Sequence, residues 1–173
     1  DTANTCLIAA SREAKAAGVR GIISVREARR LVPDIALVVQ RPDVYVKLHH
    51  RIRACIDAVV PILAARSIDE VVADIAGWTS EEAFERAKLI KQRLAAAIGP
   101  YVTCSIGLAA NELLAKIAAE MRKPDGLVAL HPADMPGPLL ELQLRDLPGI
   151  AGGMTRRLAA AGVTDVAGLL ALA

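Results

Sequence analysis

The sequence predicts an α+β fold of the ferredoxin-like type, in which long helices return to one sheet. Through residue 130, short apolar segments typical of buried strands alternate with segments whose apolar residues recur at helical spacing. Two of the helical segments, 41–60 and 79–99, are long enough to cover a sheet, as in layered α+β domains. With 54% hydrophobic residues, a chain of 173 residues can fill a substantial core.

The residues before position 35 predict a strand and two short helices. The strand is the apolar segment "TCLIAA" at 5–10. The first helix begins after Ser11, a favourable N-cap, and ends at Gly18. The second helix begins at the capping box of Ser24 and Glu27.

The central segment predicts three strands and two long helices. A strand at 35–39 precedes the amphipathic helix 41–60, and strands at 62–68 and 71–75 follow it. The next helix, 79–99, opens with a capping box and closes at a glycine.

The remaining residues complete the sheet and add a small unit. We expect a strand at 101–109, a helix 112–121 capped by Asn111, and a strand at 127–130. The Pro/Gly-rich segment 131–138 is the best candidate for a linker. The residues after it predict a separate unit of short helices.

Charge is distributed unevenly along the chain. Residues 1–60 carry ten Lys and Arg against six Asp and Glu, whereas the other 113 residues carry eleven against thirteen. A basic N-terminal region on a near-neutral body suits a partner that bears phosphate groups, without requiring one.

Several observations bear on the class of protein. No apolar run reaches the ~18 residues of a membrane-spanning helix, and the N-terminus lacks the basic segment of a signal peptide. The chain begins with Asp rather than Met, so we expect a fragment. The three cysteines never form a CxxC pair, which predicts buried reduced thiols in a cytoplasmic protein; they are Cys6, Cys55 and Cys104.

Two adjacent carboxylates, Asp69 and Glu70, lie between the apolar segments 62–68 and 71–75. Taken alone, they are more typical of a solvent-facing charged turn. The alternative is a metal site, because phosphoryl and nucleotidyl transfer use divalent ions held by carboxylates on rigid backbone. In a tight hairpin, neighbouring carboxylates can converge on one pair of ions.

Two downstream features have similar alternatives. Lys116 follows a strand and a small-residue loop, so it is either a solvated helix lysine or a point charge for a triphosphate. The segment "LPGIAGGMTRRL" at 147–158 has the helix-hairpin-helix pattern, in which backbone N–H groups hold a DNA phosphate. Arg156 and Arg157 would add charge there without reading base sequence. The alternative is an ordinary Gly-rich helical hairpin.

Two further features predict no chemistry. His49 and His50 are adjacent on a helix, so their side chains point about 100° apart. They therefore cannot form the i, i+4 pair of a helical zinc site, and we expect surface or partly packed histidines. Trp78 is expected to be a packing residue.

These features occur in an order that resembles the Y-family, or translesion, DNA polymerases, close to the bacterial DinB/UmuC (ImpB/MucB/SamB) branch. "AASREAKAAGVRGIISVREARRLVPD" is similar to the family's fingers segment, and "SIDE" to its palm carboxylate motif. "CSIGLAANELLAKIAAEMRKPDG" is similar to the palm motif that follows, and "LPGIAGGMTRRL" to the thumb. The resemblance implies fingers with part of the palm at 1–40, palm at 41–130 and a helix-hairpin-helix thumb at 131–173.

The resemblance also implies site residues. Asp69 and Glu70 would be catalytic and would ligate Mg²⁺, with two ions expected. Arg12, Lys15 and Lys116 would bind the incoming dNTP. The DNA backbone would be held by residues of the hairpin and the helix after it: Gly149, Ile150, Gly152, Gly153 and Arg156.

The sequence departs from the family at several points. We expect the family's first palm strand, with a further metal-binding Asp and an aromatic steric gate, and its little-finger domain to be absent. Arg12 and Lys15 stand where the family usually has Tyr and Arg. Glu112 stands where Lys is common, which weakens the local attraction for phosphate. Ala151 replaces the second glycine of the hairpin, which makes the backbone less permissive.

Two functional hypotheses follow. The first is a DNA-directed DNA polymerase that transfers nucleotides to a primer 3′-OH on damaged template DNA. In this hypothesis the present chain is an inactive fragment of the catalytic core, and a sliding clamp binds a missing C-terminal region. The second is a non-catalytic DNA-binding or scaffold homologue of the same fold that acts in DNA repair. Neither hypothesis involves a membrane.

Overall fold

The computed structural model describes residues 5–172 and divides at Arg41 into two units. The first unit pairs two short antiparallel strands and carries two short helices. Its elements are β1 (Cys6–Leu7), α1 (Arg12–Ala16), β2 (Ile23–Ser24) and α2 (Val25–Leu31). Ser11 and Ser24 cap the two helices by accepting hydrogen bonds from backbone N–H groups, as their positions predict.

Two expectations for the first unit are wrong. Residues 35–39 form no strand, and the side chains of Val38 and Val39 are 90% and 84% exposed. Apolar β-branched residues favour a strand only where a neighbouring strand and a covered face are available. Cys6 is exposed rather than buried, because strand alternation places Leu7, and not Cys6, on the covered face of β1.

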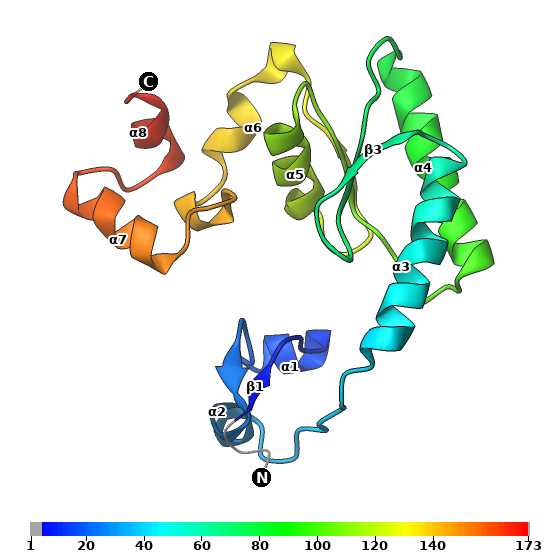
Figure 1. The fold of residues 1–173 in the computed structure, drawn as a ribbon. Helices are drawn as coiled ribbons and strands as arrows, with labels where there is room; N and C mark the ends of the chain where they lie inside the picture. The colour runs from blue at the N-terminus through cyan, green and yellow to red at the C-terminus, as the bar shows by residue number, and fades with distance from the viewer. Residues whose placement is uncertain (1–4, 173) are drawn as a thin grey trace. The chain divides into compact units, whose positions relative to one another are not determined.

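The second unit, Pro42–Ala173, contains the long helices and the remaining strands. Its first half consists of α3 (Pro42–Asp57), β3 (Ile62–Ala65), β4 (Val71–Ala73) and α4 (Ser80–Ala97). The second half consists of β5 (Ile106–Leu108), α5 (Glu112–Met121), β6 (Leu127–Ala129), α6 (Gly137–Leu140), α7 (Gly152–Ala160) and α8 (Val166–Leu170). Short 3₁₀ turns at Pro132–Asp134 and Leu144–Asp146 connect the last elements. Figure 1 shows α5 on one side of the strands and α3 and α4 on the other.

The strands do not form the single sheet that we expected. β3 pairs with β4 in antiparallel fashion and β5 pairs with β6 in parallel, while β1 and β2 form a third pair. What joins β3, β4 and β5 is a shared apolar cluster with α3 and α4, not backbone hydrogen bonding among the described residues. Ile56 and Leu94 from the helices are buried in this cluster, and Val71 and Ile106 from two different pairs pack against it.

Two predictions for the residues around this cluster are confirmed, the packing of Trp78 and the capping box after it. Trp78 packs against it, and the Arg86 guanidinium lies 5.4 Å from the Trp78 ring centroid. The capping box of Thr79 and Glu82 is complete, since each residue's side chain accepts the other's backbone N–H. No helix within residues 5–172 is long and apolar enough to span a membrane.

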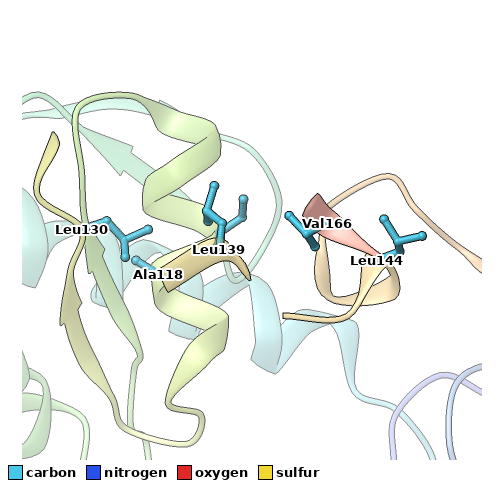
Figure 2. Packing of buried hydrophobic residues seen from close by; sticks show 6 residues of the cluster. Ala118, Leu130, Leu139, Leu144 and Val166 are labelled. Atoms are coloured by element: carbon cyan, nitrogen blue, oxygen red, sulfur yellow. The ribbon is translucent and has the colours of Figure 1, made fainter. Parts of the chain in front are cut away.

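A second apolar cluster joins α5 to the C-terminal helices (Figure 2). Ala118 of α5 and Leu130 pack together with Leu139 of α6, and Leu144 and Val166 extend the cluster toward α8. This core crosses residue 130, where we divided palm from thumb. The division itself stays a prediction, but the segment after residue 130 is packed on α5.

Lys91 of α4 anchors the turn that precedes β6. Its Nζ donates to the carbonyl oxygen of Cys104 at 2.6 Å and to that of Asp125 at 2.9 Å, and its side chain is 21% exposed. Burial raises the pKa of the neighbouring Cys104 thiol. We expect Lys91→Met to lower the free energy of unfolding by about 1–3 kcal/mol, because it leaves acceptors without their donor.

Urea unfolding followed by circular dichroism measures this loss. Lys88→Met is the matched control, since Lys88 lies on the same helix in an exposed pair with Glu85. We expect the control to change the free energy of unfolding by less than about 0.5 kcal/mol. Equal stability of the two variants would contradict the anchoring role of Lys91.

Candidate active site

The Asp69-Glu70 pair lies in the tight connection between β3 and β4. The backbone N–H groups of Arg66 and Ser67 both donate to the carbonyl oxygen of Glu70, at 2.9 and 3.3 Å. Asp69 is exposed, and its Oδ1 accepts a hydrogen bond of 2.7 Å from the Ser67 hydroxyl. The two carboxylates therefore follow one another in a closed turn on a two-stranded support. We call residues 66–70 the carboxylate turn.

The structure brings Glu70 and Lys116 together, although 46 residues separate them. Lys116 Nζ donates to Glu70 Oε1 at 2.5 Å, and the two side chains are 43% and 37% exposed. The hydrogen bond to Glu70 raises the pKa of Lys116, so the lysine is held in its charged form. One predicted metal ligand and one predicted phosphate ligand thus meet at a solvent-accessible position.

A second ion pair lies beside the first and was not predicted. Arg66 Nε and Nη2 donate to the two carboxylate oxygens of Glu112 at 2.6 and 2.7 Å. The hydrogen bond from Arg66 holds the pKa of Glu112 below its ordinary value. The substitution at Glu112 that we expected to weaken phosphate attraction is therefore matched by a cation from the carboxylate turn. One feature of the sequence could have indicated the two ion pairs. Arg66 and Glu70 have the same spacing as Glu112 and Lys116, and the charges follow in the opposite order.

His49 also contacts the carboxylate turn. Its Nδ1 lies 2.6 Å from the carbonyl oxygen of Ile68, the residue before Asp69. The side chain is half-buried on α3, as expected for a partly packed histidine. Its contact with the turn was not foreseen, because the two residues are far apart in sequence. The carboxylate turn is thus bound by α3 at one point and by α5 at two.

The chemistry of the turn fits a partial magnesium site. Mg²⁺ prefers hard oxygen ligands and is commonly held by one or two carboxylates together with substrate phosphates. Asp69 and Glu70 offer two such carboxylates on adjacent residues. Within residues 5–172, no group of three or more His, Cys, Asp and Glu side chains is placed to hold a metal ion. Asp69 and Glu70 would be a partial donor set, and their role as metal ligands stays a prediction.

An open groove of about 690 Å³ leads from Lys116 to the glycine-rich hairpin. Lys116 and Glu120 of α5 line the groove, and so does Arg145. The hairpin contributes residues 149–151. The groove thus joins two of the predicted sites on a single surface.

The hairpin combines a glycine turn with a helix start that has no side-chain cap among the described residues. Gly149 has a φ of +88°, in the left-handed region that favours glycine. Among the described residues, no side chain caps the first turn of α7, whose N-cap is Ala151. Gly152 and Gly153, at the start of α7, are both exposed, so their backbone N–H groups are accessible to a ligand. Arg156 lies one turn further, with its Nη1 next to Gly152.

Two residues of the first unit are predicted to bind the nucleotide, and their positions are described within that unit alone. Arg12 and Lys15 are exposed on α1. The carbonyl oxygen of Lys15 accepts a hydrogen bond of 3.1 Å from Arg20 Nε, which ties the helix to the following loop. Their role toward a triphosphate stays a prediction.

The sequence matches relatives over most of its length. The impB/mucB/samB family matches residues 1–120. DNA polymerase IV of Moorella thermoacetica is 38% identical over 168 residues, which cover 95% of this chain and 42% of that protein. DNA polymerase IV of Pseudomonas aeruginosa is 35% identical over 161 residues, or 92% of this chain and 46% of that protein. The chain spans less than half the length of these relatives.

Solved structures show the same likeness. A Y-family DNA polymerase chimera aligns with a TM-score of 0.87 and 28% identity over 99% of this chain and 50% of that chain. DinB from Sulfolobus solfataricus aligns with a TM-score of 0.86 and 28% identity over 96% of this chain and 49% of that one. These alignments confirm the α+β class. Since the family match also covers more than half of the chain, the protein belongs to the impB/mucB/samB family and has the fold of Y-family DNA polymerases.

Proposed function

We propose that this chain is a catalytic-core fragment, inactive alone, of a translesion DNA polymerase, which transfers nucleotides to a primer 3′-OH on damaged template DNA. The observation that carries the proposal is the groove, which joins Lys116, in contact with Glu70, to the hairpin at Gly149. A polymerase needs this continuity, because the primer end must reach the carboxylates while its backbone is held further along. The relatives named DNA polymerase IV support the proposal.

Each predicted residue has a role in this proposal. Asp69 and Glu70 supply oxygen ligands for two Mg²⁺ ions. When bound, Mg²⁺ stabilises charge on the attacking and leaving oxygens of an in-line displacement. Lys116 releases Glu70 and donates to the triphosphate, whose charge it helps to neutralise. Arg12 and Lys15 are assigned to nucleotide binding by the resemblance of their segment to the fingers of Y-family polymerases, and their positive charge suits a triphosphate.

The hairpin has a different role in the proposal. The backbone N–H groups of Gly152 and Gly153, next to the loop of Gly149 and Ile150, bind a backbone phosphate of primer–template DNA. Arg156 adds a charge to this contact without selecting a base sequence. We place the protein in the cytoplasm and assign a sliding clamp to a region outside this chain.

Primer extension tests the proposal. The complete gene product that contains this chain should extend a primer on undamaged and damaged templates with Mg²⁺, and EDTA should stop the reaction. The alternative, a non-catalytic DNA-binding homologue, is compatible with Lys116 occupying Glu70 and predicts DNA binding without extension. Binding of primer–template with no extension under any Mg²⁺ concentration would reject the polymerase assignment.

The hairpin contact makes a separate prediction about salt. The affinity for primer–template should fall as salt rises, because phosphate contacts release counterions. Arg156→Gln should weaken binding and reduce the slope of log affinity against log salt by about 1. Arg93→Gln is the control, since Arg93 is exposed on α4 and belongs neither to the hairpin nor to α7. Fluorescence anisotropy with labelled DNA measures both, and identical slopes would argue against Arg156 as a phosphate contact.

A further inference from the structure

We propose that Arg66 and Glu112 form a positioning pair that holds the carboxylate turn on α5 from outside the reacting centre. The inference rests on the proposed function for its kinetic consequence alone. Arg66 follows β3 directly, and Glu112 is the first residue of α5. The pair therefore joins the base of the carboxylate turn to the start of the helix that carries Lys116.

The geometry of the pair favours a positioning role over a simple charge contact. Both carboxylate oxygens of Glu112 are engaged, by Nε and Nη2 of Arg66 at 2.6 and 2.7 Å. Two parallel hydrogen bonds fix the direction of approach as well as the distance, which one lysine–carboxylate contact does not. The fork thus restrains the orientation of the turn relative to α5.

The order of charges also defines the register. Arg66 and Glu70 are four residues apart on the turn, and their partners Glu112 and Lys116 are four residues apart on α5. The signs are reversed between the two pairs. A slip of α5 by one helical turn would bring Arg66 against Lys116, or Glu70 against Glu112. Like charges would then meet, so only the observed register satisfies both pairs.

The two ion pairs differ in whether they stay formed when substrate binds. In the proposed function, Lys116 leaves Glu70 to bind a triphosphate, so their contact is lost when substrate arrives. Arg66 and Glu112 are assigned no ligand and can stay together throughout. Among the described side chains, this pair then remains the ionic link between the turn and α5. Asp69 and Glu70 keep their position on the helix during the reaction.

The test uses charge reversal in the complete gene product. Arg66→Glu and Glu112→Arg each break the fork, and the double variant rebuilds an ion pair with its polarity reversed. Each single variant should increase hydrogen exchange at the turn amides of Arg66 and Ser67 by about 10-fold. Each should also lower kcat for primer extension by about 10-fold, with KM for dNTP changed less than about 2-fold. The double variant should recover most of each loss.

Mn²⁺ binding separates positioning from simple electrostatics. If Arg66 and Glu112 act only through their charge, Arg66→Glu should tighten Mn²⁺ binding and Glu112→Arg should weaken it. Positioning predicts that both weaken it, by about 10-fold, as for residues that orient metal ligands. Isothermal titration measures the affinity, and Asp69→Asn identifies the binding that belongs to the turn. Effects of opposite sign would overturn the inference.

A milder variant and a control pair complete the experiment. Arg66→Gln is the milder variant if reversal impairs folding, and it should give smaller changes of the same sign. Exchanging the charges of Glu85 and Lys88, an exposed pair on α4, is the control and should leave all readouts unchanged. A gene product that binds DNA but never extends a primer would reject the proposed function, and hydrogen exchange would still decide the positioning role. Unchanged exchange in both reversals would overturn it.

Discussion

Asp69→Asn and Glu70→Gln, made one at a time in the complete gene product, are each expected to reduce primer extension by about 1,000-fold. Each change removes one negative charge from a two-carboxylate donor set while keeping the size of the side chain. Both variants should fold normally, because the amide oxygen that replaces each carboxylate can still accept the hydrogen bond from the Ser67 hydroxyl or from Lys116. Stability measured by urea unfolding should therefore stay near that of the parent protein.

A carboxylate close in sequence provides the control for this prediction. Asp74 follows β4, is exposed, and accepts a hydrogen bond of 2.8 Å from the backbone N–H of Ala76, which an asparagine would also do. Asp74→Asn should extend primers at the parent rate. Steady-state and single-turnover extension assays with Mg²⁺ measure the three variants. Parent-level extension by either Asp69→Asn or Glu70→Gln would remove the carboxylate turn from the catalytic assignment.

Gly107→Ala is expected to lower the free energy of unfolding by more than about 3 kcal/mol. A Cβ atom at Gly107 would lie 1.9 Å from the carbonyl oxygen of Ala115 and 2.6 Å from the nitrogen of Ala119. These are backbone atoms of α5 and cannot turn away, so the helix would have to move off β5. α5 also carries Glu112 and Lys116, the two ion-pair partners of the carboxylate turn, so the change should impair activity as well.

A matched glycine separates this steric effect from a general cost of substitution. A Cβ atom at Gly153, in the first turn of α7, would meet nothing within 4 Å. We expect Gly153→Ala to change the free energy of unfolding by less than about 1 kcal/mol, or to stabilise slightly by restricting the unfolded chain. Urea unfolding of the second unit gives both values. Similar stability of the two variants would show that α5 does not need the close approach at Gly107.

Much of the local structure could be predicted because it depends on neighbouring residues. The N-caps at Ser11, Ser24, Thr79 and Asn111 act on N–H groups three residues away, and all four are present. The long helices and the hairpin of β3 and β4 follow from periodicity and from a polar interruption of an apolar segment. The segment 35–39 shows where this fails, because its strand-like composition finds no partner strand.

The candidate site was predictable to a smaller extent. The motifs around Asp69 and Lys116 indicated which residues matter, and their contact through Glu70 agrees with a shared site. The roles of these residues toward metal, nucleotide and DNA stay predictions. His49, Arg66 and Gly107 were missed as contributors, since each acts on a segment distant in sequence.

The sequence by itself determined the family, the N-caps of four helices and the identity of the paired carboxylates, because these are encoded in short motifs and local hydrogen bonds. Only the tertiary structure decided that Glu70 meets Lys116, that Arg66 compensates for Glu112, and that a groove joins α5 to the hairpin. These contacts arise when the apolar faces of α5 and the strands pack together. Packing fixes which exposed charges become neighbours, and the matched spacing of Arg66–Glu70 and Glu112–Lys116 becomes a pair of contacts only because their segments pack together.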